Sequence, residues 1–445
     1  MLMVKELGVS REYTTEEEWL EDIFYRSNSY GSKTNAQFAL RAFDMFCKEK
    51  LGIEDPDIEE LENEFKKKHN ITKKSQMVNN PKWTKYRKDF LAKFYQEARL
   101  QIAEQYQTWY NQNPQDILSI CTSLQKWVRF CSQDHPEVKL YPNRTWTLKK
   151  PATILQYFSH IKDYLRKCHG VRITSDDVRA YIKFPKQMKV QREPLELEDI
   201  KKLLEFADPQ RRALYYTLLS SAMRLGEGLS LKKHSFNIDV RPIEIHLRAQ
   251  DTKTGEARTC YISEEAWEKV APIYNATNDG EYLFNKENRR KDRAVQHEDR
   301  YFIRLREKIA KKFGDKAPCD QFPDGTGMLR RYEDSSRYCI QIHAFRSWFM
   351  TKAMKVHDKD YADAISGHHS YLDQYIRIPK KEQQKMYLEV EKAIQIETSR
   401  VYSEQFHEAE IAQMQEEIAK LKAMAERKEE PEYHKESRDS VGVTS

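Results

Sequence analysis

Glycine, proline and long apolar runs are all scarce in this chain. Among 445 residues there are 13 glycines and 15 prolines, and so few turn-forming residues favour a mainly helical chain. No apolar run approaches the roughly 20 residues that a membrane span requires, so we expect no membrane segment. Residues 1–19 lack the apolar core of a signal peptide, and we therefore expect a cytoplasmic protein.

The cysteines follow no spacing typical of a metal site or a disulfide framework. There are seven, and no two form a C-x-x-C pair, which favours reduced thiols in an intracellular protein. The formal net charge is only +6, so charge balance alone does not indicate a nucleic-acid partner. With 33% charged and 11% aromatic residues, the chain is too aromatic for a disordered polyelectrolyte, and its length predicts two or three domains.

Helical periodicity and a dense basic segment mark the first third of the chain. Phe38, Ala42, Phe43 and Phe46 share one predicted helical stripe. Over residues 64–90, nine basic residues face two acidic ones, a local charge of nine minus two, or +7. Like charges at this density repel each other unless an anion such as phosphate relieves them; the alternative is a solvated helix face. The basic residues are Lys66, Lys67, Lys68, Lys73, Lys74, Lys82, Lys85, Arg87 and Lys88.

The rest of the chain divides into segments of different pattern. Residues 184–196 are basic, contain two prolines and lack periodicity, which predicts a linker. Alternation of apolar and polar residues on both sides of Thr254–Gly255 predicts a β-hairpin. Apolar residues at a/d spacing predict an amphipathic helix over 399–430, long enough to dock or dimerise. Residues 431–445 are expected to be disordered.

Three segments carry residues suited to phosphate chemistry. Arg224 stands in an otherwise apolar stretch with Glu227 one turn later, and a charge there must be paired or face a site. His343 and Arg346 share one face of a predicted helix. A Gly–His pair ending at His368 is followed closely by tyrosines. Phosphodiester cleavage without a metal needs fixed cationic donors, and the planar fork of arginine matches phosphate.

This ordered set resembles the tyrosine recombinases of the phage-integrase type, and the segments QIHAFRSWF and GHHSYLDQYIR are most similar to integrases of archaeal viruses and integrative elements. The resemblance implies a mainly α fold with a small β-hairpin or sheet. It implies a helical DNA-clamping core-binding region over residues 1–183 with a basic insertion at 64–110. It also implies an α+β tyrosine-recombinase catalytic domain over residues 197–398.

The resemblance further implies a role for each cationic residue of the motifs. Arg224 and Arg346 would hold the scissile phosphate. His343 and His368 would donate further hydrogen bonds to it, and Glu227 would orient Arg224. No cofactor and no metal ion are expected, because the arginines supply the charge that a metal would supply.

The proton donor and the nucleophile are likewise carried over from the family. Lys253, in the predicted hairpin turn, would protonate the leaving 5′-oxygen; Lys233 and Arg258 lie nearby in sequence and are the alternatives. Tyr375 would attack and form a 3′-phosphotyrosine, although family members often place the nucleophile two residues later, where this chain has Arg377. Tyr371 stands very close to His368 for this role, and Tyr387 lies on an apolar helical stripe that favours core packing.

The function expected from the resemblance is that of a site-specific recombinase or integrase. It would cleave and rejoin double-stranded DNA at attachment sites, integrating or excising a viral or mobile element. It would act as a homotetramer linked through the C-terminal helix at 399–430. The alternatives are a type IB topoisomerase or telomere resolvase with the same chemistry, and a DNA-binding accessory protein with a decayed site.

Overall fold

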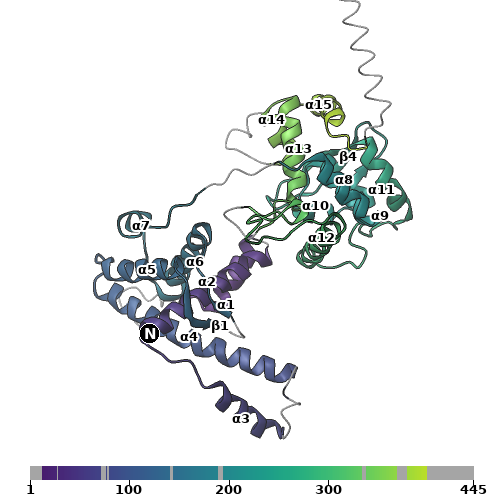
Figure 1. Cartoon of the computed structure of the whole chain (residues 1–445). Helices are drawn as coiled ribbons and strands as arrows, with labels where there is room; N and C mark the ends of the chain where they lie inside the picture. The colour runs from purple at the N-terminus through teal and green to yellow at the C-terminus, as the bar shows by residue number, and fades with distance from the viewer. Residues whose placement is uncertain are drawn as a thin grey trace, which may run out of the picture. The chain divides into compact units, whose positions relative to one another are not determined.

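The computed structural model describes residues 13–27, 29–71, 77, 80–140, 144–188, 194–332, 337–367 and 378–397. They form two compact units divided near residue 189, inside the predicted linker segment 184–196 (Figure 1). Helices dominate both units, and each has one small antiparallel sheet. The predicted mainly helical fold class with a small sheet is therefore confirmed. No helix within these ranges is long and apolar enough to cross a membrane.

The first unit is a helical bundle with one short β-hairpin. Its elements are α1 (Glu16–Ser27), α2 (Tyr30–Leu51), α3 (Ile58–His69), α4 (Pro81–Gln112), α5 (Leu118–Cys131), β1 (His135–Leu140), β2 (Arg144–Trp146), α6 (Pro151–His169) and α7 (Ser175–Tyr181). The β1–β2 hairpin was not predicted. Pro151 opens α6, and Gly170 closes it in the left-handed conformation that favours glycine.

Helix α2 lies at the centre of this unit, but its buried face differs from the predicted stripe. Ala42, Phe43 and Phe46 are buried as predicted, whereas Phe38 is 46% exposed. Phe38 precedes Phe43 by five residues, about 140° around a helix, so the two point to different faces. Leu40 takes the buried place instead.

A buried ion cluster joins α1, α2 and α4. The Arg99 guanidinium, only 1% exposed, donates to Glu16 Oε2 at 2.6 Å, and its Nε lies 3.2 Å from Asp44 Oδ1. Two carboxylates thus share one arginine. Burial raises the pKa of Asp44 to about 7 even though Arg99 lies beside it.

This raised pKa predicts a pH-dependent stability of the first unit. Asp44 binds its proton in the folded chain up to about pH 7 but loses it near pH 4 when unfolded, so the stability is greatest at low pH and declines as the pH rises toward 7. We expect amides of α2 to exchange faster at pH 8 than at pH 5 after correction for intrinsic rates, by a protection difference on the order of 2–4 kcal/mol. Hydrogen–deuterium exchange of the full chain measures this.

Asp44→Asn should abolish this decline. Asp163→Asn is the matched control, because its carboxylate accepts hydrogen bonds from Trp19 and Arg166 elsewhere in the same unit, and it should preserve the decline. An equal decline in Asp44→Asn and in the unmodified chain would contradict the assignment.

The second unit packs helices around a three-stranded antiparallel sheet of order β3–β4–β5. Its elements are α8 (Leu197–Phe206), α9 (Pro209–Ser221), α10 (Leu225–Gly228), β3 (Phe236–Asn237), β4 (Ile243–Leu247), β5 (Arg258–Ile262), α11 (Glu264–Ala276), α12 (Lys291–Phe313), α13 (His343–Val356), α14 (Lys359–Ser366) and α15 (Lys380–Ala393). Strands β4 and β5 pair from Ile243↔Ile262 to Leu247↔Arg258, so a hairpin forms around Gly255, as predicted.

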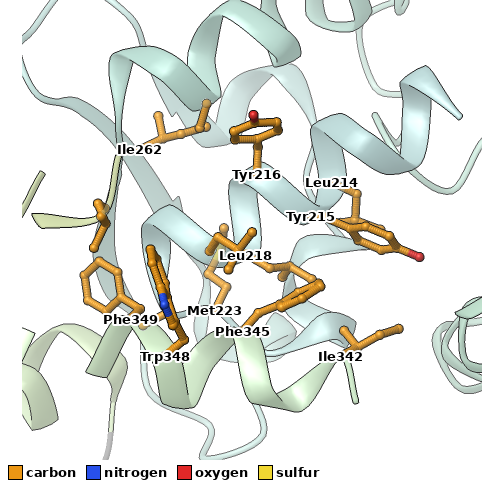
Figure 2. Packing of buried hydrophobic residues seen from close by; sticks show 14 of the residues in the cluster. Leu214, Tyr215, Tyr216, Leu218, Met223, Ile262, Ile342, Phe345, Trp348 and Phe349 are labelled. Atoms are coloured by element: carbon orange, nitrogen blue, oxygen red, sulfur yellow. The ribbon is translucent and has the colours of Figure 1, made fainter. Parts of the chain in front are cut away.

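The core of the second unit lies between α9 and α13. Figure 2 shows Leu218 and Met223 meeting Phe345 at its centre, with Tyr215 beside Phe345. All of α9 from Ala213 to Ser221 is buried, so this helix is enclosed on every side. Its C-terminal end is therefore fixed in place, and the chain leaves it directly toward Arg224.

Candidate active site

The C-terminal end of α9 is held by side chains from two other helices. Ala222 follows α9 in the left-handed conformation, at φ 54°. The Arg346 guanidinium on α13 donates through Nη1 to the carbonyl oxygen of Ala222. Tyr387 on α15 donates its hydroxyl to the carbonyl oxygen of Ser220 at 2.8 Å. Because the last carbonyls of a helix lack partners within the helix, these two bonds satisfy groups that burial would otherwise leave unpaired.

Arg224 and Glu227 form the first part of the site. Arg224 immediately precedes α10, and Glu227 lies one turn later. The backbone N–H of Arg224 donates to Glu227 Oε2 at 2.8 Å, and its guanidinium Nη1 donates to Oε1 at 3.1 Å. The Arg224 side chain is 21% exposed, whereas that of Glu227 is almost fully buried. Glu227 therefore ties the Arg224 side chain to the corner between α9 and α10.

Arg258, the first residue of β5, is a second partner of Glu227. Its Nη2 lies 2.5 Å from Oε2 and its Nη1 lies 3.2 Å from Oε1, a bidentate pair. Burial alone would raise the pKa of Glu227, but the hydrogen bonds and charge of Arg258, together with Arg224, hold it below its ordinary value. Glu227 is therefore an ionised carboxylate between two arginines.

Arg346 completes the group and is 2% exposed. Its Nε and Nη2 have no hydrogen-bond partner in the part of the chain that the structure describes. Burial lowers the pKa of Arg346 to about 10, and the positive charges of Arg224 and Arg258 act in the same direction. Three arginines against the single carboxylate of Glu227 leave a net charge of three minus one, or +2. A partly buried excess of positive charge with free donors is suited to an anion.

Lys291 lies beside this group, whereas Lys253 makes no contact with it among the described residues. Lys253 is exposed in the loop between β4 and β5. Lys291 begins α12, and its Nζ donates to the carbonyl oxygen of Asp251, at the start of the same loop. Its stem packs on Gly226, where an added Cβ would lie 2.9 Å from Lys291 Cε. Neighbouring groups displace water from the Lys291 ammonium and lower its pKa.

The other predicted site residues are placed only in part. His343 is exposed at the first position of α13, one turn before Arg346. Gly367 closes α14 in the left-handed conformation, at φ 68°. His368, Tyr371 and Tyr375, which follow it, lie outside the described residues, as does the segment 399–430.

Tyr387 is enclosed in the core, away from solvent. It is fully buried, with its ring centroid 5.2 Å from that of Tyr261. Its hydroxyl is engaged by the carbonyl oxygen of Ser220. A phenol in this position is not available to an external phosphate, and the packing interpretation of its apolar stripe remains the better one.

The predicted basic residues lie around a small satellite core at the junction of α3 and α4. There Phe65 packs its ring 5.2 Å from those of Trp83 and Tyr86. Lys66 is paired with Glu62 at 2.6 Å, Arg87 is half-buried, and Lys73 and Lys74 lie outside the described residues. The exposed members are Lys67, Lys68, Lys82, Lys85 and Lys88.

Two residues of this arrangement were not assigned to it from the sequence: Lys291, and Arg258, which was only an alternative to Lys253. One signal in the sequence could have indicated Arg258, a charge followed by the apolar Cys260 and Ile262 of a predicted strand. Lys291 lies in a basic stretch with Arg289, Arg290 and Arg293, but no local pattern predicts its contact with Gly226, which joins distant segments.

Comparison with known proteins yields weak structural matches only. No family model matches the chain, and no curated protein matches it. Among solved structures, the chain is similar to the XerH site-specific recombinase bound to its difH substrate, with 17% identity, coverage of 60% of this chain and 69% of that one, and a TM-score of 0.33. It is similar to the Tn1549 transposon integrase in complex with transposon right-end DNA, with 15% identity, coverage of 60% and 83%, and a TM-score of 0.37.

A lambda integrase dimer bound to a COC′ core site matches with 17% identity over 52% of this chain and 76% of that one, at a TM-score of 0.35. These neighbours are site-specific recombinases and integrases. Superpositions of this quality do not transfer an activity, so the assignment of a function depends on the geometry of the site itself.

In the anion-free protein, the repulsion that Arg346 meets from Arg224 and Arg258 is offset by its bond to the Ala222 carbonyl oxygen. Arg346→Met removes both, so we expect the free energy of unfolding of the second unit to change by less than about 2 kcal/mol. Pyrophosphate should raise the thermal midpoint of the unmodified chain by binding the folded state, and this rise should vanish in the variant. Calorimetry with and without pyrophosphate measures both effects.

Arg306→Met is the matched control. Arg306 is also buried, and its guanidinium donates to the carbonyl oxygen of Ile340 at 2.7 Å, but it is not among the charges that act on Arg346. This variant should retain the response to pyrophosphate. An Arg346→Met protein that pyrophosphate still protects would refute the anion assignment.

Proposed function

We propose that the chain is a tyrosine recombinase, an enzyme that breaks and rejoins DNA strands through a 3′-phosphotyrosine intermediate. The observation that carries this proposal is the buried group of Arg224, Arg258 and Arg346 around the single carboxylate of Glu227, with two Arg346 donors unpartnered among the described residues. Such a group stabilises the extra negative charge that a phosphodiester acquires in the transition state of its cleavage.

The proposed reaction uses the residues of the three sequence motifs. Arg224 and Arg346 hold the non-bridging oxygens of the scissile phosphate, and His343 and His368 donate further hydrogen bonds. Tyr375 attacks phosphorus, and its phenolic proton passes to solvent water as the new ester forms. The bond to the 5′-oxygen breaks, and Lys253 supplies the proton that this oxygen takes up. Reversal by a second 5′-hydroxyl reseals the strand without an external energy source.

The biological setting is inferred from the resemblance of the sequence motifs to the tyrosine recombinases. We infer double-stranded attachment-site DNA as the substrate, and integration or excision of a viral or mobile element of the archaeal type as the outcome. The exposed lysines at the junction of α3 and α4 would contact phosphates flanking the cleavage site. A homotetramer joined through residues 399–430 would hold two duplexes, and the protein would act in the cytoplasm.

Covalent capture of DNA tests the proposed reaction. A pool of random duplexes with a nick in one strand, incubated with the chain in EDTA, should yield a protein–DNA adduct that survives denaturation, because the nicked fragment diffuses away before resealing. Sequencing the captured DNA identifies the target sequence. Tyr375→Phe should abolish the adduct, and mass spectrometry of the native adduct should place the phosphate on residue 375.

Tyr371→Phe and Tyr387→Phe are the controls and should still form the adduct. Tyr387→Phe should lose only the bond to the Ser220 carbonyl, at a cost of about 1–2 kcal/mol in stability. An adduct that persists in Tyr375→Phe and disappears in Tyr387→Phe would show that the nucleophile is wrongly assigned. If a supercoiled plasmid that carries the captured sequence is relaxed, and two duplexes are never joined, the activity is that of a topoisomerase.

The exposed lysines at the junction of α3 and α4 predict a salt-dependent contribution to DNA binding. Changing Lys67, Lys68, Lys82, Lys85 and Lys88 to glutamine should weaken binding. It should also reduce the slope of log affinity against log salt by up to about 0.9 for each phosphate that the variant can no longer neutralise. Fluorescence anisotropy between about 50 and about 300 mM salt measures the slope. Changing the same five residues to arginine keeps the charge and should leave the slope unchanged; equal slopes in the two variants would exclude this surface from DNA.

A further inference from the structure

We propose that Arg258 is a positioning residue of this site. By occupying Glu227 it keeps the donors of Arg224 free for phosphate, and it packs against Gly367 at the C-terminal end of α14. This inference assigns a role to a residue outside the family motif described above, and it rests on the proposed function.

The two oxygens of Glu227 are divided between the two arginines. Oε1 accepts from Arg224 Nη1 at 3.1 Å and from Arg258 Nη1 at 3.2 Å. Oε2 accepts from the backbone N–H of Arg224 at 2.8 Å and from Arg258 Nη2 at 2.5 Å. Arg258 thus makes the bidentate contact, and Arg224 commits a single guanidinium N–H to the carboxylate. The remaining guanidinium donors of Arg224 make no hydrogen bond with any described residue.

Removal of Arg258 would change this division in a predictable way. Glu227 is 1% exposed, and a buried carboxylate that loses its bidentate partner either takes up a proton or draws a nearby cation closer. Arg224 is the cation at hand, and a bidentate pair with Glu227 would engage donors that the phosphate needs. With Arg258 bound to Glu227, most guanidinium donors of Arg224 therefore remain free. Without Arg258, the carboxylate would engage them.

Arg258 also touches the last described residue of the α14 corner. A Cβ added to Gly367 would lie 3.0 Å from Arg258 Cδ and 3.1 Å from its Nε and Nη1. The same strand is tied to the same corner by Cys260, whose Sγ donates to the carbonyl oxygen of Ile365 at 3.7 Å. Arg258 therefore spans the distance from Glu227 to Gly367, and it links the Arg224 corner to the C-terminal end of α14.

Arg258 acts through these neighbours, since its own side chain is only 8% exposed. Both of its terminal nitrogens are committed to Glu227. Direct contact with DNA would require it to give up a buried ion pair. The geometry thus distinguishes Arg258 from Arg224, whose side chain is 21% exposed, and from Arg346, whose Nη2 has no partner among the described residues.

The test is the single-turnover rate of adduct formation on a nicked duplex of the captured sequence. We expect Arg258→Met to lower this rate by about 10–100-fold, with DNA affinity and its salt dependence unchanged. Arg258→Lys should recover part of the loss, because it restores the charge without the bidentate geometry. Arg241→Met is the matched control, since Arg241 is an exposed arginine of the same sheet region, paired with Glu264, and should cleave at the normal rate.

A double-mutant cycle separates positioning from a purely structural role. If Arg258 acts through Arg224, its loss in an Arg224→Lys background should lower the rate by less than about threefold further. Should Arg258→Met fold poorly, Glu227→Gln/Arg258→Met removes both partners of the buried pair. This double variant should then cleave no more slowly than Glu227→Gln alone.

The outcomes that overturn the inference are distinct from the failure of the proposed function. Normal cleavage by Arg258→Met, or losses that multiply fully with those of Arg224→Lys, would show that Arg258 does not position Arg224. A double variant far slower than Glu227→Gln would show the same. Absence of an adduct with the unmodified chain would instead refute the recombinase assignment itself.

Discussion

The Glu227 carboxylate, shared between Arg224 and Arg258, is the interaction on which the described part of the site depends. It lies in a short helix that follows α9, and its partners come from the start of that helix and from β5. Arg346 approaches from α13 and carries a positive charge that this single carboxylate does not balance. The relative positions of α9, β5 and α13 therefore decide whether the three guanidinium groups converge, and the core between α9 and α13 fixes those positions.

In the same arrangement, Arg346 makes a stabilising hydrogen bond and also carries a destabilising buried charge. Helix α9 ends with carbonyl groups that are buried, and Tyr387 and Arg346 supply donors to two of them. Arg346 thus has a structural bond on one side and unpartnered donors on the other, as far as the described residues show. A neutral residue of similar size would relieve the repulsion from Arg224 and Arg258, but it would also remove the donors that an anion needs. Retention of a costly buried charge is typical of a binding site.

The two compact units differ in the cationic groups that they would present to the proposed DNA substrate. The second unit provides a small number of enclosed arginines suited to one phosphate group, and the first provides exposed lysines around Phe65, Trp83 and Tyr86. Exposed lysines contact a phosphate backbone without fixed geometry, whereas the buried arginines are held by defined hydrogen bonds. Under the proposed function, DNA affinity would therefore reside mainly in the first unit and the chemistry in the second.

The sequence by itself determined the mainly helical class and the hairpin around Gly255, because these depend on local periodicity and turn-forming residues. It also singled out Arg224, with Glu227 one turn later, as a charge in an apolar segment that demands a partner, and Arg346 as a neighbour of His343 on one helical face. It did not reveal the division of Glu227 between two arginines, or the contact of Lys291 with Gly226. Those are contacts between residues far apart in sequence, and no local pattern encodes them. The apolar stripe of Tyr387 already indicated core packing, but only the tertiary structure brought Arg258 and Arg346 to the Arg224 corner, because these contacts join distant strands and helices.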